Sequence, residues 1–540
     1  MGEPVSFQSG PKQWAVVAGL AAICLFGLCA IYLLYRASPS QVAIPIAPGV
    51  GQTNTGVATS TQVSPATPPQ SANKLGTVGP KVAAATMPVG FRTIHNDFFW
   101  RDQSGAQIYA RSGCLRQFNG LFYWYGEWNG GVKGGNDHTC YCSNDLVHWT
   151  YRGIVLHSFV GDPMDVLYND STRQYVMFLK CQGTYGNLAV ATSPTPDGQF
   201  TSIRQTLVGG MKIGDMSVFK DTDGKAYLAF AQNRDLYLYA LSADYQSVGN
   251  LINRWLTSIE RHAPFIFKRN DKYYYCVKNG RGWQAGPMDF FMATDLAGPW
   301  SAARPLVTTD SGDAWESEGD FVVPIQGTQG TVYMYDGDRW GGRPPGPRRG
   351  DFLWLPMEFN GDVPVLNYYQ DWDLDVTTGT WRRFDTSRDL ALGKPATASS
   401  DDGKNIASNV TASTSFENYD NCRWESESSD PQWIMVDLGA ATEINRVILK
   451  WHTDCAKAYK IQASTDGRAW TDVYNNSKGL PYTVTDETFP TTTARYVRMY
   501  GSERATQAGY SLFSFMVLND SAESGTPAAA PSPSGSMPAP

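Results

Sequence analysis

The sequence carries little charge and has no excess of basic residues. Of its 540 residues, 44 are Lys or Arg and 51 are Asp or Glu, so the net charge is -7. A protein that binds nucleic acid needs a basic surface to hold the phosphates, which this composition does not supply. Nucleic acid is therefore not expected as a partner. Aromatic residues, by contrast, reach 13%, and such a chain folds around a core instead of staying disordered.

Metal-binding patterns are also missing. The nine cysteines form no C-x-x-C pair, which leaves little support for a zinc or thioredoxin-type site. We expect no metal and no cofactor, and a single structural cation is left open. A Cys422–Cys455 disulfide and buried free thiols are both open for the remaining cysteines.

Charge is absent altogether from residues 14–35, near the N-terminus. As a helix this segment would be about 33 Å long, enough to cross a bilayer and longer than the apolar core of a cleavable signal peptide. It follows a short N-terminal segment, 1–13, and precedes residues 37–88, which are rich in Ser, Thr, Pro and Ala and predict a disordered tether. We therefore expect a single-pass membrane protein whose folded domains lie outside the cytoplasm (periplasmic, luminal or cell-surface), with a disordered tail over 520–540.

A short aromatic strand recurs five times over residues 91–385. The repeated tyrosines lie 47 to 59 residues apart, at Tyr123, Tyr175, Tyr227, Tyr274 and Tyr333. A period near 50 with several short strands per unit is typical of a β-propeller. The repeats therefore predict five blades. Residues 386–519 instead contain short alternating strands with turns such as TDGR between them, which predict a β-sandwich. The fold class is thus all-β, with one N-terminal transmembrane helix.

Ionisable residues occupy equivalent positions at the starts of the predicted inner strands. They lie 12 to 15 residues before each repeated tyrosine, at Arg111, Asp162, Asp215, His262 and Glu318. Inner strands line the funnel of a propeller, so these side chains are expected to converge at its mouth. Cleavage of a glycosidic bond needs two carboxyl groups about 5–10 Å apart, and Asp215 and Glu318 are the candidates. A structural salt bridge is the alternative for each carboxylate taken alone.

Other side chains are candidates for sugar contact at the same mouth. Glu127 ends the aromatic strand of the first repeat. Trp283 and Trp340 lie in Gly-rich loops, where packing between blades is the alternative, and Asp338 and Arg339 precede Trp340. Together with two of the inner-strand residues they form the predicted substrate-binding set: Glu127, Arg111, Asp162, Trp283, Asp338, Arg339 and Trp340.

Residues 91–385 resemble glycoside hydrolase family 43, in particular the branch that includes exo-β-1,3-galactanases. The resemblance is carried by FYWYGE, CSNDLVHW, DMSVFKDTDGKAYLAF, APFIFKRNDKYYY, MYDGDRW and FLWLPMEF, in this order. It implies a five-bladed propeller that hydrolyses the glycosidic bonds of a polysaccharide, which is galactan- or arabinan-like.

The same resemblance implies roles for single residues. Asp215 matches the aspartate that orients the acid and tunes its pKa, and Glu127 matches a glutamate that recognises sugar. Glu318 stands where the branch has a catalytic glutamine. The glutamate that donates the proton normally precedes Ala-Pro, but here His262 takes that place and Glu260 lies two residues earlier. Both are candidate donors. Whether the protein is an enzyme is open: the alternative is a catalytically degenerate propeller that serves as a non-enzymatic glycan-binding or adhesive protein.

Residues 386–519 resemble an F5/8 type C (discoidin) domain, family 32 of carbohydrate-binding modules. The matching stretches include CRWESESSDPQWIMVDLG, INRVILKW and YKIQASTDGRAW. The resemblance implies a galactose-binding-like jelly roll that binds glycan. Its candidate contacts are Arg423, Trp424, His452 and Tyr510, and maintenance of the fold is the alternative for Trp424 and Tyr510.

Overall fold

A computed structural model describes residues 90–128, 137–181, 185–232, 234–280, 282, 285–307, 313–339, 351–412 and 422–520. The predicted N-terminal segment, membrane anchor and tether lie outside these residues, as do Trp283, Trp340 and all but the first residue of the predicted tail. No helix in the described part of the chain is long and apolar enough to cross a membrane.

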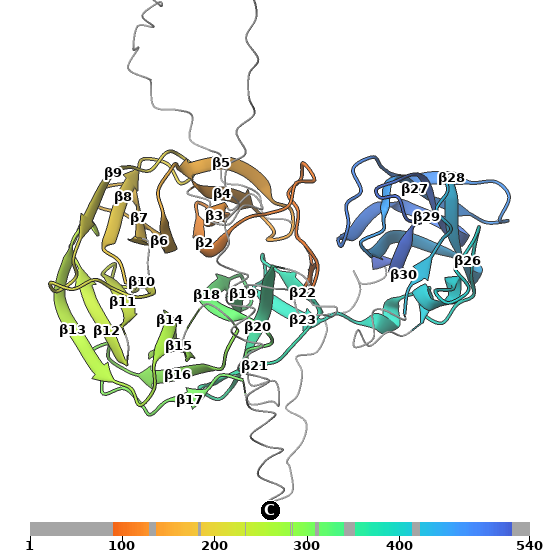
Figure 1. Ribbon diagram of the computed structural model, residues 1–540. Helices are drawn as coiled ribbons and strands as arrows, with labels where there is room; N and C mark the ends of the chain where they lie inside the picture. The colour runs from red at the N-terminus through yellow and green to blue at the C-terminus, as the bar shows by residue number, and fades with distance from the viewer. Residues whose placement is uncertain are drawn as a thin grey trace, which may run out of the picture. The chain divides into compact units, whose positions relative to one another are not determined.

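Four-stranded antiparallel sheets follow one another along the propeller, each built from consecutive strands (Figure 1). The first contains β2 (Arg111–Phe118), β3 (Leu121–Trp128), β4 (Asp137–Ser143) and β5 (Thr150–Leu156). The second contains β6 (Gly161–Asn169), β7 (Gln174–Cys181), β8 (Leu188–Ser193) and β9 (Thr201–Thr206). The third contains β10 (Met216–Lys220), β11 (Ala226–Gln232), β12 (Asp235–Leu241) and β13 (Val248–Leu256). The fourth contains β14 (Arg261–Arg269), β15 (Lys272–Asn279), β16 (Met288–Ala293) and β17 (Arg304–Pro305). The fifth contains β18 (Glu318–Gln326), β19 (Thr331–Asp338), β20 (Phe352–Asn360) and β21 (Val363–Leu366).

A sixth sheet has three strands and joins the two ends of the propeller sequence. In it, β1 (Arg92–His95) pairs with β22 (Asp371–Asp375), which pairs with β23 (Thr380–Arg383). The prediction of five blades is therefore wrong, because the propeller has six. The repeated aromatic strand could not reveal the sixth, whose strands are short and lack it.

The repeated aromatic strand is the second strand of its sheet and is buried on both faces. Successive side chains of a strand point to opposite faces. In β3, Phe122 and Trp124 accordingly pack in one core cluster with Trp354 of β20, whereas Tyr123 and Tyr125 pack in another with strands of the second sheet. Burying one such side chain stabilises the fold by roughly 1.5–3 kcal/mol. The side chains of the recurring aromatic strand thus form much of the hydrophobic core between neighbouring sheets.

The hairpin between β2 and β3 shows how the turns are specified. Asn119 and Gly120 have φ angles of 52° and 81°. Positive φ at both central residues defines the tight turn that matches the twist of two antiparallel strands, and an Asn-Gly pair adopts it at little cost. This turn fixes the register in which Arg111 at the start of β2 faces Glu127 near the end of β3.

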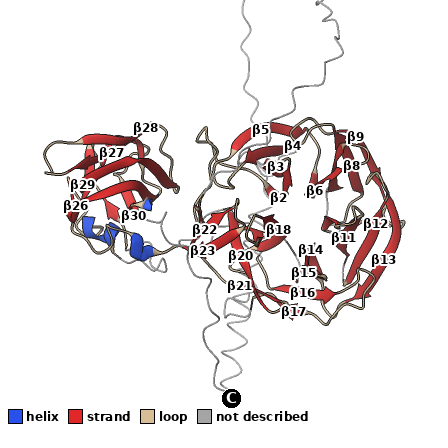
Figure 2. Cartoon of the chain, turned by 180° about the vertical axis from the view of Figure 1, so that it is seen from behind, coloured by secondary structure: helices blue, strands red, loops and turns tan. Residues whose placement is uncertain are grey.

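The C-terminal domain is a β-sandwich. Its strands are β24 (Ala396–Ala398), β25 (Trp424–Glu425), β26 (Gln432–Trp451), β27 (Ala456–Ser464), β28 (Thr471–Asn476), β29 (Val484–Arg504) and β30 (Ser511–Leu518). Hydrogen bonding orders them as β25-β30-β26-β29-β27-β28, and β24 pairs with β26. Two short 3-10 helices, η1 (Thr386–Arg388) and η2 (Ala407–Thr411), are the helical elements among the described residues (Figure 2).

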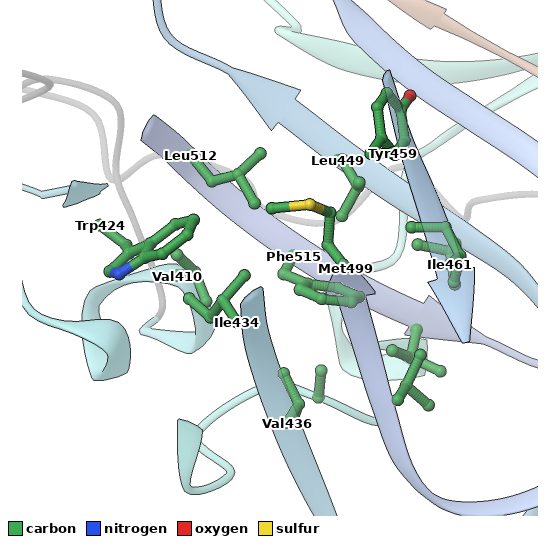
Figure 3. Packing of buried hydrophobic residues seen from close by; sticks show 14 of the residues in the cluster. Val410, Trp424, Ile434, Val436, Leu449, Tyr459, Ile461, Met499, Leu512 and Phe515 are labelled. Atoms are coloured by element: carbon green, nitrogen blue, oxygen red, sulfur yellow. The ribbon is translucent and has the colours of Figure 1, made fainter. Parts of the chain in front are cut away.

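The core of the sandwich is apolar and fully enclosed. Figure 3 shows Trp424 against Val410 and Ile434, with Leu512 and Phe515 beyond them. The seven cysteines in the described part of the chain are all free, so of the two alternatives left open for them the structure has free thiols and no Cys422–Cys455 disulfide.

Candidate active site

The five inner strands contact one another in a closed ring, from β2 through β6, β10, β14 and β18 back to β2. The predicted ionisable residues lie at equivalent ends of these strands: Arg111, Asp162, Asp215, His262 and Glu318. The repeat thus correctly predicted that these residues lie at equivalent strand ends. Their roles stay predictions. Four of the strands shift register just after this point, in the pairings of β2, β6, β14 and β18. Such β-bulges re-aim side chains and are common beside active sites.

Asp215 links two neighbouring blades. Its Oδ1 accepts a hydrogen bond from Lys180 Nζ at 2.8 Å, and its Oδ2 lies 3.1 Å from His262 Nδ1. Burial alone would raise the pKa of Asp215, but the charge of Lys180 and the hydrogen bonds from Lys180 and His262 hold it well below its usual range. Asp215 is therefore held as an anion in contact with His262.

The other nitrogen of His262 faces a second carboxylate. Nε2 lies 3.8 Å from Glu260 Oε1 and makes no hydrogen bond in the described part of the chain. Lys180, Asp215, His262 and Glu260 thus form a continuous row of alternating basic and acidic groups. Both donors that the sequence suggested, His262 and Glu260, end this row at the funnel.

Glu318 is held by a buried lysine. Its Oε1 lies 2.6 Å from Lys278 Nζ, and the two residues are 6% and 1% exposed. Burial raises the pKa of Glu318 to about 7, against the lowering effect of Lys278 and with a further rise from the charge of Asp215. The charges of Asp215, Asp162 and Glu318 all raise the pKa of Lys180 against the effect of burial, so each of these carboxylates is near enough to Lys180 to act on it.

Glu127 lies at the same mouth, on β3. Burial raises its pKa to about 7, the charge of Asp162 adds to the rise, and Arg111 opposes it. Arg111 itself forms an ion pair with Asp351, a residue that sequence reasoning did not single out. These three predicted substrate-binding residues, Glu127, Arg111 and Asp162, are therefore close enough to act together electrostatically.

Two predicted sugar contacts need correction. Asp338 is completely buried, and its Oδ2 accepts a hydrogen bond from the Ser112 backbone at 2.6 Å. Arg339 is 8% exposed and pairs with Asp97 at 2.6 Å. Neither side chain is placed to contact a sugar, because each is enclosed among protein groups.

The two buried lysines were missed although the repeat contains a signal for them. Lys180 and Lys278 lie four or five residues after the repeated tyrosine of their strands, as Glu127 does after Tyr123. In the fourth blade this position faces the start of the inner strand, where Lys278 pairs with His262. The end of the aromatic strand, which singled out Glu127 in the first repeat, would therefore have singled out both lysines in theirs.

The sandwich gives a mixed result for its candidate contacts. Trp424 and Tyr510 are fully buried, and their polar atoms bond to the Ser400 carbonyl and to Asp430. They are core residues, so the prediction that they contact glycan is wrong and the alternative holds. Arg423, which pairs with Glu425 at 2.6 Å, and His452, which lies edge-on to Phe513, are partly exposed.

Comparison with known proteins gives a family match within each of the two domains. Residues 113–348 match the family Glycosyl hydrolases family 43, and residues 395–515 match the F5/8 type C domain. An exo-β-1,3-galactanase from Clostridium thermocellum is 25% identical, with 79% of this chain and 100% of that chain covered and a TM-score of 0.50. A galactanase of the same kind from Phanerochaete chrysosporium, solved with β-1,3-galactotriose, has the same coverage and TM-score at 22% identity and supports the fold.

A curated relative matches only in part. A polysaccharide lyase 8 family protein from Enterococcus faecalis is 29% identical over 96 residues, which are 17% of this chain and 7% of that protein. The family 43 match and the Clostridium galactanase together support the assignment of a glycoside hydrolase acting on polysaccharide.

Proposed function

We propose that the propeller hydrolyses glycosidic bonds at the ends of a galactan-like polysaccharide, with an arabinan-like polymer as the other candidate substrate. The observation that carries the proposal is the contact between Asp215 and His262 at 3.1 Å, with Lys180 behind it and Glu318 on another blade of the same mouth. The galactanases of similar structure support the choice of sugar.

Each group has a distinct task in this reaction. Asp215 holds Nδ1 of His262, so that Nε2 and the adjacent Glu260 are directed to the leaving oxygen, to which one of them donates a proton. Glu318 acts on the opposite side as the base that removes a proton from the attacking water, and Lys278 keeps it in place. Glu127, Arg111 and Asp162 bind the hydroxyl groups of the terminal sugar.

The test is release of galactose from β-1,3-galactotriose by the purified protein, compared with release of arabinose from arabinan oligosaccharides. Product from the first and none from the second fits the proposal. Binding of galactotriose without any product contradicts it.

A second function is favoured by one observation. His262 stands at the position where the family carries its proton-donating glutamate. An imidazole is not the usual donor to a glycosidic oxygen, so the alternative is a non-enzymatic propeller that binds glycan as a binding or adhesive protein. The experiment above separates the two, because this alternative requires saturable binding with no turnover.

We further propose that the sandwich binds the same polymer and so raises the local concentration of substrate at the propeller. Arg423 and His452 are its partly exposed candidate contacts. Isothermal titration of the full chain should use a galactan that is too long to be bound by the propeller site alone. We then expect two classes of binding sites, one in the propeller and one in the sandwich. A single class of sites, lost together with propeller binding, would oppose this.

We also propose that residues 14–35 anchor the protein in a membrane, with the folded domains on the far side from the cytoplasm. The support is the length of this uncharged segment and the tether that follows it. Protease added to intact cells should cut the tether. Full protection of the domains, while a known surface protein is cleaved, would contradict the proposed orientation.

A further inference from the structure

Three aspartates gather on one face of the fifth propeller sheet. Asp336 and Asp338 are two residues apart on β19 and so point to the same face. Asp320 lies on β18 at the register shift between Gly319 and Phe321, opposite this pair. One carboxylate oxygen from each aspartate lies within 4.8 Å of the others. The cluster is separate from the Asp215–His262 row.

The negative charge of these carboxylates is only partly balanced, by Arg111, whose charge lowers the pKa of Asp338. Asp336 and Asp338 are 2% and 0% exposed. The nearby basic residues already hold other carboxylates, since Arg111 pairs with Asp351, Lys278 with Glu318, and Arg339 with Asp97. The three carboxylates therefore share little positive charge, and an excess of buried negative charge is strongly unfavourable unless something compensates it.

Two carboxylate oxygens also point into the cluster without a partner. Asp338 Oδ1 and Asp320 Oδ2 are buried and form no hydrogen bond with the described residues. Two other oxygens of the cluster accept hydrogen bonds, because the Trp354 indole donates to Asp336 Oδ1 and the Ser112 backbone donates to Asp338 Oδ2. Those donors stabilise ionised carboxylates, and only a cation or a proton can lie between two facing acceptors.

We propose that Asp320, Asp336 and Asp338 bind a divalent cation and that the cation is Ca²⁺. Three carboxylates form an all-oxygen ligand set, which hard divalent cations prefer. Ca²⁺–oxygen distances of about 2.3–2.6 Å allow two ligands of one ion to lie up to about 5 Å apart, whereas the shorter Mg²⁺–oxygen distances allow at most about 4 Å. The carboxylate oxygens of the cluster lie within 4.8 Å of one another, a separation that one Ca²⁺ ion can span.

Such an ion would cross-link β18 and β19 at the end of the sheet where Glu318 begins its strand and faces Asp338 across the pair. It would therefore stabilise the fifth sheet and hold Glu318 in position, whether or not the protein hydrolyses glycan. The inference stands independently of the proposed function.

The experiment uses the purified full chain after treatment with a chelator. Tb³⁺ is the probe, because Trp354 contacts Asp336 and can transfer excitation energy to a lanthanide bound there. We expect sensitised Tb³⁺ emission that Ca²⁺ displaces, and a Tm that rises by a few degrees when Ca²⁺ is added, since a ligand that binds only the folded state stabilises it.

Two variants and one control locate the site. Asp338→Asn and Asp320→Asn should each weaken Tb³⁺ and Ca²⁺ binding at least tenfold. Asp223→Asn removes the same charge from an exposed turn and should bind as the wild type does. If either cluster variant fails to fold, the Ca²⁺-dependent Tm of the wild type still decides whether an ion binds.

Three results would overturn the proposal. An unchanged Tm and no displaceable emission in the wild type would mean that the carboxyl groups share protons instead of a cation. Emission that survives in both cluster variants would place the ion elsewhere. A Tm that Mg²⁺ raises but Ca²⁺ does not would reject Ca²⁺ as the ion.

Discussion

Candidate binding residues were predicted more accurately at the mouth of the propeller than in the loops of the sandwich. At the mouth, all five ionisable residues taken from equivalent repeat positions lie at equivalent strand ends. In the sandwich, two of four residues chosen for their aromatic or polar type, Trp424 and Tyr510, are buried in the core. A sequence repeat shows where a residue lies within its blade as well as what type of residue it is. Residue type alone cannot separate a ring that packs from a ring that binds.

The largest effect is expected at the mouth. Asp215→Asn and Glu318→Gln should each lower the rate of galactose release by about 10²–10⁴-fold, because the first removes the anion that holds His262 and the second removes the proposed base. The measurement is product release from β-1,3-galactotriose, with binding followed by titration calorimetry, and binding should persist.

Asp223→Asn is the matched control for this pair, since it removes a carboxylate from an exposed turn of the same propeller. Its rate should equal that of the wild type. Turnover that survives both Asp215→Asn and Glu318→Gln would reject the assigned roles.

In the sandwich, two neighbouring residues differ in burial and should therefore differ in their effect on stability. Trp424→Ala should lower the free energy of unfolding by about 3–5 kcal/mol, because it empties a large volume of the core. Arg423→Ala, one residue earlier but partly exposed, should change it by less than about 1 kcal/mol. Chemical denaturation followed by circular dichroism measures both. Equal losses would mean that Arg423 is as structural as Trp424.

The pH dependence tests the unusual donor. A carboxyl group titrates about two pH units below an imidazole, so His262→Glu should move the acid-donor limb of the rate profile to lower pH. The measurement is kcat for galactose release between pH 3 and 9 in the wild type and the variant. A profile that does not move would exclude His262 as the proton donor and favour Glu260. Activity that appears only in the variant would support the non-enzymatic alternative for the natural chain.

The smallest effect is expected for glycan binding by the sandwich. Arg423→Ala and His452→Ala should each weaken galactan binding by up to about tenfold, the equivalent of one lost hydrogen bond. Arg468→Ala, at an exposed turn of the same domain, is the control. Affinity that both variants retain in full would exclude these loops as the binding surface.

What the sequence predicts depends on whether a feature repeats. The aromatic strand recurs, so the propeller, its inner strand ends and Glu127 follow from counting. The sixth sheet does not recur, because β1 and β22 are short strands from distant parts of the chain. Lys180 and Lys278 were within reach of the same count. The burial of Asp338 was not, since it depends on how Ser112 of β2 lies against it, and a sequence does not state which side of a strand end is covered.

The sixth sheet has a consequence for how the protein is made. Arg92 pairs with Leu374 and His95 with Asp371, so residues emerging early from the ribosome wait for residues synthesised near the end of the propeller. The earlier sheets are hairpins of consecutive strands and can form as they appear, whereas this one closes a very long loop. Closing such a loop is slow because its entropy must be lost before any contact is gained. The sixth sheet is therefore expected to be the last part of the propeller to form, and a chain that stops short of Asp375 should leave β1 without its complete partner strand.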